Sequence, residues 1–326
     1  MPSSPRNAGH RTRGRRPRHS FVDSGGRESR RSTATRGAFS ALIVLITILA
    51  SPSCRPGNDG APDQAPKASQ GGPTAEPEPQ VPAAPAGGLS PEQRLRADRL
   101  ISNFEHGTTE FLYGSAEVLQ DGRGITFGRA GFTTKWGDGH DVIKRYTAAK
   151  SGNPLARYLP RLEVLAREES GSTEGLDGFI EAVRQEAADP QFRVAQDALQ
   201  DELYYQRSAK SSDALGLRTA LARTAIYDTL LMHGAGDDPD GLPALLERTR
   251  KDVGGTPATG VDEATWLSAF LRVRRDDLAH AHNPETRDVW AESVGRVDVF
   301  RTLADQGNWD LHGPIVLRGD YAAMIP

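Results

Sequence analysis

The chain has 326 residues, a single cysteine and a formal net charge of −3. One cysteine excludes an intrachain disulfide, so packing has to stabilise any fold, and the length allows one large domain or two small ones. The near-neutral total conceals a basic leader, because residues 1–36 hold ten arginines against Asp23 and Glu28, about +8, which leaves about −11 for residues 37–326. Such an acidic body attracts cationic partners and repels nucleic acid and anionic lipid, which argues against a nucleic-acid-binding function.

Residues 1–54 form a basic leader followed by a signal-peptide pattern. The apolar run AFSALIVLITILA at residues 38–50 is shorter than the ~20 residues of a membrane span and is typical of a signal-peptide core. Cys54 follows small residues and is a candidate lipidated residue, although Pro52 departs from the usual lipoprotein motif. Lipoprotein processing and ordinary signal-peptidase cleavage both remain open, with an uncleaved anchor as the third alternative. Export is expected in each of the first two cases.

A linker and one folded domain follow the leader. Residues 55–88 are rich in Pro, Ala and Gly and have almost no large apolar residue, so they are predicted to be a disordered tether. Residues 89–326 carry helical patterns throughout most of their length and are predicted to form the folded domain. The fold class predicted from these patterns is mainly α, with one small β element.

The folded domain begins with a helix signal. Ser90 is a candidate N-cap, Pro91 suits the first helical position, and the apolar spacing that follows places Glu105 near the helix end. Residues 113–134 are rich in Gly and β-branched residues and predict a hairpin or irregular sheet. The further helical patterns cover residues 141–150, 154–169 with an interruption at Pro160, 176–188, 191–205, 214–233, 242–251, 263–278 and 289–306.

Two carboxylates stand out in residues 104–138. Glu105 lies near a helix end beside Phe104, where partial burial favours a protonated carboxyl, and Asp121 opens a glycine-flanked turn. Glycoside hydrolysis usually uses such a pair, one group as acid and the other ionised. On physical grounds alone, the simpler interpretation is favoured, in which Glu105 is a solvated helix-end residue and Asp121 an ordinary turn former.

The wider sequence resembles the glycoside hydrolase family 46 chitosanases. That family has a glutamate in a short E-N-G/S segment, followed by D-G-R-G-[YF]-T-x-G; here the two segments read EHG at residues 105–107 and DGRGITFG at residues 121–128. The likeness extends over residues 90–320. Ile125 in place of Tyr or Phe, His106 in place of Asn, and Trp136 in place of a smaller residue are departures that put the substrate preference in doubt, but none removes a catalytic group.

The resemblance implies a lysozyme-like fold with two helical lobes and a substrate cleft between them, and a role for each matched residue. Glu105 would be the general acid, Asp121 the general base and Thr126 a residue that positions the attacking water. The reaction would invert the anomeric centre, with the two carboxyls about 6.5–9.5 Å apart or more. Substrate contacts are implied for Arg123, Asp138 and Glu117.

Asp138 also has a simpler interpretation, as N-cap of a helix that starts near Asp141. As a substrate contact, its carboxylate would suit the ammonium groups of chitosan.

A second segment, residues 227–234, resembles the family's Y-D-x-x-x-x-H-G motif. The resemblance implies a charge network in which Arg274 orients Glu105 while Asp228 and Arg296 fix Arg274. A purely structural ion-pair network is the alternative, and both roles are compatible.

Other candidates are weaker. His233 and the acidic residues 237–240 match neither zinc nor calcium spacing, so no metal is expected. A substrate-binding histidine of the family matches His280 or His282, without a choice between them, and Asp320 is a similarly loose match.

The sequence therefore predicts an exported, cofactor-free, monomeric chitosanase that cleaves chitosan internally. Its partner would be the cationic polysaccharide, with no nucleic acid, and with membrane contact only through a lipid anchor at Cys54. The first rival is a lysozyme-like or chitin-directed hydrolase. The second is a non-catalytic saccharide-binding lipoprotein, against which the complete Glu105, Asp121 and Thr126 set argues.

Overall fold

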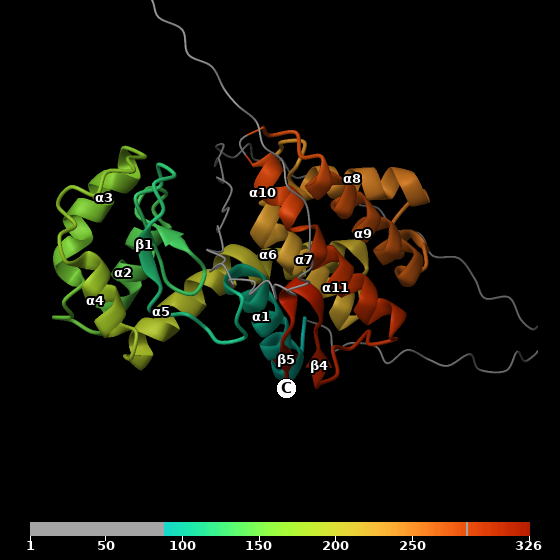
Figure 1. The fold of residues 1–326 in the computed structure, drawn as a ribbon, viewed down its shortest axis with the longest axis horizontal. Helices are drawn as coiled ribbons and strands as arrows, with labels where there is room; N and C mark the ends of the chain where they lie inside the picture. The colour runs from blue at the N-terminus through green and yellow to red at the C-terminus, as the bar shows by residue number, and fades with distance from the viewer. Residues whose placement is uncertain (1–87, 285) are drawn as a thin grey trace, which may run out of the picture. The chain divides into compact units, whose positions relative to one another are not determined.

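The computed structural model describes residues 88–284 and 286–326, which lie in one unit of the chain (Figure 1). The predictions made for the leader, for Cys54 and for the linker up to residue 87 lie outside the described residues. No helix within the described ranges has the length and apolar character needed to cross a membrane.

The described residues are mainly helical, which confirms the predicted fold class. The α-helices are α1 (Pro91–His106), α2 (Asp138–Ala149), α3 (Leu159–Arg167), α4 (Phe179–Glu186), α5 (Pro190–Gln200), α6 (Gln206–Leu215), α7 (Ala220–His233), α8 (Leu242–Val253), α9 (Glu263–Ala279), α10 (Arg287–Glu292) and α11 (Val294–Asp305). The π-helical segment η2 (Asp201–Tyr205) joins α5 to α6, and the short 3₁₀ turns are η1 (Ala156–Tyr158), η3 (Pro257–Thr259) and η4 (Gly319–Tyr321).

The predicted β region forms a three-stranded antiparallel sheet. Its strands are β1 (Ala116–Val118), β2 (Ile125–Phe127) and β3 (Phe132–Thr133), in the order β1-β2-β3. The register places Glu117 opposite Thr126. A second pair, β4 (Ile315–Val316) with β5 (Met324–Ile325), was not predicted, because two-residue strands carry too little periodicity to be recognised.

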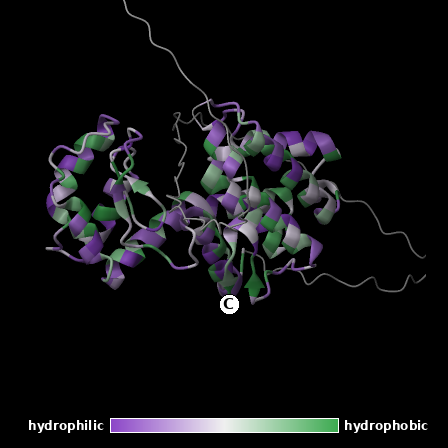
Figure 2. Ribbon diagram, in the orientation of Figure 1, coloured by the Kyte–Doolittle hydropathy of each residue, from purple (hydrophilic) through white to green (hydrophobic). Residues whose placement is uncertain are grey.

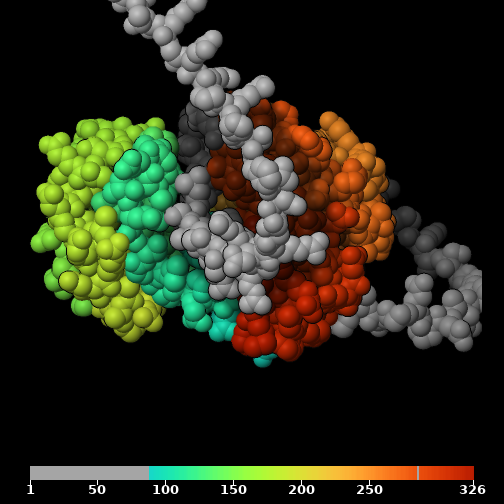
Figure 3. All heavy atoms as spheres, viewed as in Figure 1, coloured from blue at the N-terminus to red at the C-terminus, as the bar shows by residue number. Residues whose placement is uncertain are grey.

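Helix α1 follows the sequence signals closely. Ser90 and Gln93 make a capping box, Pro91 is the first helical residue, and Gly107 ends the helix in the left-handed conformation with φ 66°. The C-terminal residues pack beside α1, since Asn103 Nδ2 donates to the Tyr321 carbonyl at 2.8 Å. Residues from the two ends of the described chain therefore adjoin, as the cyan and red atoms in Figure 3 show. This packing fixes the helix end that carries Glu105.

Several predicted helix boundaries were wrong. Residues 191–205 were predicted as a complete helix, but the π segment lets the helical chain continue through α6 to Leu215. Gly216 and the N-cap Thr219 then delay the start of α7, which was predicted at residue 214. Pro160 stands at the start of α3, after η1, where proline is tolerated.

Two main hydrophobic cores underlie this arrangement. One joins the three-stranded sheet to α2–α5 and includes Phe127, Tyr146 and Phe179; the other joins α1 to α7–α11 and includes Trp266 and Trp290. Figure 2 shows hydrophobic and hydrophilic residues intermixed along most of the helices, as expected where one face is buried. A small third cluster of Ile101, Tyr204, Tyr227 and Leu231 connects α1, η2 and α7. Two cores agree with the predicted two lobes.

Candidate active site

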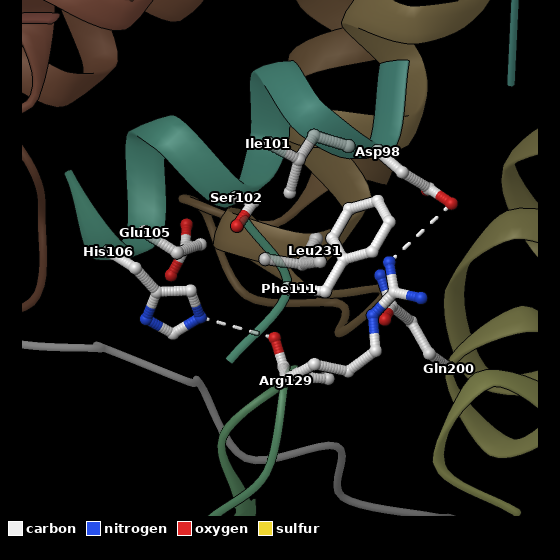
Figure 4. A pocket seen from close by; sticks show the side chains of 10 residues that line it. Asp98, Ile101, Ser102, Glu105, His106, Phe111, Arg129, Gln200 and Leu231 are labelled. Atoms are coloured by element: carbon white, nitrogen blue, oxygen red, sulfur yellow. Dashed lines mark hydrogen bonds and ion pairs between the residues drawn. The ribbon is translucent and has the colours of Figure 1, made fainter. Parts of the chain in front are cut away.

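Glu105 lies in the last turn of α1 and lines a pocket. Its side chain is 13% exposed, and the pocket wall also includes His106, Phe111 and Arg129 (Figure 4). His106, which follows Glu105, donates from Nε2 to the Arg129 carbonyl at 3.2 Å. The α1 end is thus tied to the loop after β2, and Glu105 is held in a largely desolvated place.

A chain of ion pairs runs inward from Glu105. Arg296 Nη1 lies 2.6 Å from Glu105 Oε1, and Arg296 Nη2 donates to Asp228 Oδ1 at 2.6 Å. Asp228 Oδ2 lies 2.7 Å from Arg274 Nη2. Each of these residues comes from a different helix: α1, α11, α7 and α9. The four predicted members are therefore brought together across the core of the α1 and α7–α11 lobe.

Burial and pairing oppose each other in this network. Burial disfavours the charged form of Asp228, but the two guanidinium groups outweigh it and hold the pKa of Asp228 below its usual value. Burial also opposes the charge on Arg296, and the carboxylates of Asp228 and Glu105 raise its pKa in spite of that burial. Both groups are therefore ionised, and each depends on its partner.

The predicted order of the two arginines was wrong. Arg296, and not Arg274, contacts Glu105; Arg274 lies one step further in, on Asp228. The reason is packing: the Arg296 guanidinium stacks over Phe104, with its carbon 5.1 Å from the ring centroid, which places it beside the neighbouring Glu105. Sequence spacing gave no sign of which arginine would face α1.

Asp121 forms a closed turn with Arg123. Asp121 Oδ2 accepts from Arg123 Nε at 2.8 Å, and Oδ1 accepts from the Arg123 backbone N–H at 3.0 Å. Partial burial acts to raise the pKa of Asp121, but the hydrogen bonds and charge of Arg123 outweigh it, and the pKa lies below its ordinary value. Asp121 is thus kept ionised, as a general base must be.

Glycine is required in this turn. Gly124 has φ 79°, and a Cβ there would lie 2.3 Å from Thr134 Oγ1. The sequence DGRG therefore has a structural cause, because no side chain fits where the turn approaches the strand-end residue.

Thr126 and Glu117 lie opposite each other on β2 and β1. Thr126 is 3% exposed, and its Oγ1 is buried without a hydrogen-bond partner among the described residues. Glu117 is exposed. A buried hydroxyl without a partner costs free energy, so a bound water or substrate atom is the natural partner for Thr126.

Asp138 is the first residue of α2, which starts three residues earlier than the alternative interpretation required. The N-cap position belongs to Gly137, and Asp138 Oδ1 instead accepts from the Thr133 backbone N–H and hydroxyl, each at 3.1 Å. Burial raises the pKa of Asp138 to about 6, although the Thr133 hydrogen bonds act in the opposite direction. The capping interpretation of Asp138 was therefore wrong. Because burial disfavours the ionised carboxylate, a nearby cation would stabilise it.

Tyr204 packs against Ile101 and Leu231 of the pocket wall, and sequence reasoning missed it. It lies in η2, is 5% exposed, and its hydroxyl pKa is raised first by burial and then by the charges of Asp138 and Glu105. The charges of Glu105 and Asp138 therefore both disfavour ionisation of the Tyr204 hydroxyl. The pair Tyr204-Tyr205 in a helical run was the only available signal, and a π segment has no clear sequence mark.

The two candidate histidines, His280 and His282, have different surroundings. His280, which follows α9, is exposed and lies beside Asp276 of that helix, whereas His282 Nδ1 lies 2.6 Å from Asp240 Oδ1. Asp240, Asp277 and His282 place ligand-type atoms within 4.8 Å of one another. Arg248 pairs with Asp277, and the backbone N–H groups of His282 and Asn283 donate to Asp240. These donors fit an ion-pair cluster better than a metal centre.

The arrangement thus offers one carboxyl at a helix end under an arginine, one ionised carboxylate on a turn, and an unpartnered hydroxyl in the adjacent strand. Those are the parts of an acid–base hydrolase that acts on a glycosidic bond.

Comparison with known proteins adds a family. The model of glycosyl hydrolase family 46 matches residues 99–315. A chitosanase of Bacillus subtilis (strain 168) is 53% identical over 235 residues, which cover 72% of this chain and 85% of the relative. A chitosanase of Streptomyces sp. (strain N174) is 32% identical over 283 residues, 86% of this chain and 94% of the relative.

The solved structures to which this chain is similar include chitosanases. The native chitosanase from Bacillus subtilis MY002 has a TM-score of 0.68 at 52% identity and covers 73% of this chain and 100% of its own. A mutant of the chitosanase from Bacillus subtilis MY002, complexed with 6 GlcN, has a TM-score of 0.68 at 51% identity with the same coverage.

Proposed function

Because the chain belongs to glycosyl hydrolase family 46, we propose that it is a chitosanase that cleaves β-1,4 linkages between D-glucosamine residues within chitosan. The observation that carries this proposal is the ion-paired Glu105 beside Arg296, in a fold whose relatives at about half identity are chitosanases. One solved relative is complexed with 6 GlcN, which supports glucosamine oligomers as the substrate class.

The proposed mechanism uses two carboxyl groups. Glu105 donates a proton to the leaving oxygen, and Asp121 takes a proton from water that attacks the opposite face of the sugar, with inversion. The depressed pKa of Asp121 supports the base role, because the group is ionised at mildly acidic pH. Thr126 Oγ1 accepts a hydrogen bond from the attacking water or donates one to it.

Charge supports a polycationic substrate. Residues outside the basic leader carry an excess of carboxylates, and the half-buried carboxylate of Asp138 favours pairing with a cation. The ammonium group of a glucosamine unit is such a cation. Arg123 and Glu117 are the other proposed substrate contacts, each beside a catalytic candidate.

A comparison of three polymers tests the activity. We expect release of reducing ends from fully deacetylated chitosan and little or none from chitin or bacterial cell wall. Activity confined to the acetylated polymers would favour the chitin-directed or lysozyme-like rival. Binding of chitosan without release would favour a saccharide-binding protein.

Product stereochemistry tests the mechanism separately. Proton NMR of a glucosamine oligomer during hydrolysis should show the α-anomer first, because water displaces a β-linked leaving group once. Initial accumulation of the β-anomer would contradict the role given to Asp121.

We further propose that residues 89–326 act as an exported, monomeric catalytic domain behind a leader and tether. The leader pattern supports export, and Cys54 remains the candidate for lipidation. Metabolic labelling with a fatty acid, wild type beside Cys54→Ser, separates a lipid-anchored protein from a freely secreted one.

A further inference from the structure

His233 ends α7 as a fully buried side chain with a contact on each ring nitrogen. Its Nδ1 lies 2.9 Å from the Asp240 carbonyl oxygen, and its Nε2 lies 3.3 Å from Arg274 Nε. Trp290 packs against the ring at 4.6 Å between centroids. The imidazole therefore has a fixed orientation.

The two contacts also fix the tautomer. A guanidinium group only donates hydrogen bonds and a carbonyl only accepts them, so Nε2 is the acceptor and Nδ1 carries the proton. Burial, and then the charge of Arg274, lower the pKa of His233 to about 3. The ring is therefore neutral at mildly acidic and neutral pH.

Charged groups surround His233 on several elements. Arg274 and Asp277 lie on α9, with Asp277 Oδ2 3.5 Å from Nδ1, Asp228 lies on α7, and Arg296 lies on α11. The nearest carboxylate is paired with Arg248. The neutral ring thus supplies what a second carboxylate could not: an acceptor for Arg274 without added negative charge.

A continuous line of contacts connects His233 with the acid. It runs from His233 to Arg274, to Asp228, to Arg296 and to Glu105. At its other end, the Asp240 carboxylate accepts the backbone N–H groups of His282 and Asn283. The loop that carries His282 is therefore linked to Glu105 through buried side chains.

We propose that His233 is a positioning residue for the catalytic acid: its Nε2 lone pair fixes Arg274, which sets the place of Asp228, Arg296 and Glu105. This inference rests on the proposed function. His233 does not contact the substrate in this proposal, so it affects kcat and not KM.

Two variants of His233 separate the nitrogens. In His233→Gln the amide oxygen reaches the position of Nε2 and still accepts from Arg274; in His233→Asn the amide nitrogen reaches Nδ1 and leaves Arg274 Nε without an acceptor. We expect the Asn variant to lose about 10- to 100-fold in kcat with little change in KM, and the Gln variant to recover most of it. The alkaline limb of the kcat/KM profile should move in the Asn variant only, since Arg296 sets the charge around Glu105.

Trp290→Phe is the matched control. It reduces packing against the His233 ring but leaves both hydrogen bonds, so thermal stability should fall while the pH profile stays in place. Equal losses in the Asn and Gln variants, with an unmoved profile, would overturn the positioning role. Wild-type inactivity on chitosan would overturn the proposed function instead.

A measurement of the His233 tautomer in the wild-type protein tests the inference without a variant that could fail to fold. Nitrogen-15 NMR of the imidazole should show the proton on Nδ1, unchanged between about pH 5 and pH 8. A proton on Nε2, or titration in that range, would contradict the inference.

Discussion

Arg296 Nη1 lies 2.6 Å from Glu105 Oε1, while the other terminal nitrogen of the same guanidinium bonds Asp228. One planar group thus serves two carboxylates, of which one is buried in the core and one lines the candidate pocket. The proposed catalytic acid is therefore oriented by a residue whose own position is set by the protein interior.

Arg296→Lys tests that bridge. A single ammonium group cannot reproduce two separated donors, so Glu105 or Asp228 loses its partner and kcat falls by about 10- to 100-fold. Steady-state rates on a soluble glucosamine oligomer measure the loss. Arg275→Lys is the control, because Arg275 forms an exposed pair with Asp298 and should leave the rate unchanged. An Arg296→Lys rate equal to wild type would refute the bridging role.

Asp228→Asn removes the only carboxylate shown between Arg274 and Arg296 in the described core. Two buried guanidinium groups then face each other, and the free energy of unfolding should fall by about 3–5 kcal/mol. Denaturant melts measure the change. Asp252→Asn breaks an exposed pair with Arg272 and should cost no more than about 1 kcal/mol. Similar losses for both variants would mean that the network contributes nothing special to stability.

Arg123→Gln tests the state of Asp121. Arg123 lowers the Asp121 pKa, so the base stays ionised, and activity persists, down to a pH below its ordinary range. Without Arg123 the Asp121 pKa rises, and the acid limb of kcat/KM should move to higher pH. Arg145→Gln, which breaks an exposed pair with Glu202, should leave that limb in place. A limb that stays fixed in Arg123→Gln would show that a different group is the base.

Thr126→Val tests the unpartnered hydroxyl. The substitution keeps the shape of the side chain and removes only its hydrogen-bonding capacity, so kcat should fall about 10- to 100-fold while the protein stays folded. Thr224→Val is a close control, because Thr224 Oγ1 is likewise buried without a partner, in α7. Equal activity of the Thr126 variant and wild type would remove Thr126 from the mechanism.

Much of the fold followed from local signals. Ser90, Pro91 and Gly107 determine where α1 begins and ends, and these capping residues are readable because their effect is confined to a few neighbours. The continuation through η2 to Leu215 was not readable, since a π segment depends on the packing of Tyr204 and Tyr205 against other elements.

In the candidate site, too, local motifs were predictable and contacts that depend on packing were not. Glu105, Asp121 and Thr126 could be named from a motif, and the DGRG turn explains its own glycines. The sequence did not show which arginine contacts Glu105. Arg274 and Arg296 lie 169 and 191 residues further along the chain, and helix packing decides which of them reaches Glu105. The same reason hid the role of His233, whose contacts exist only once α7 and α9 are packed together.

Reducing-end release from fully deacetylated chitosan at mildly acidic pH, wild type beside Glu105→Gln, tests the account most directly. Glu92→Gln serves as the control, because Glu92 is on the same helix and its side chain is 83% exposed. We predict release by wild type and by the Glu92 variant, and near-complete loss in a folded Glu105 variant. Equal release by the Glu105 variant would show that another group is the acid, and no release by any of the three would contradict the chitosanase function itself.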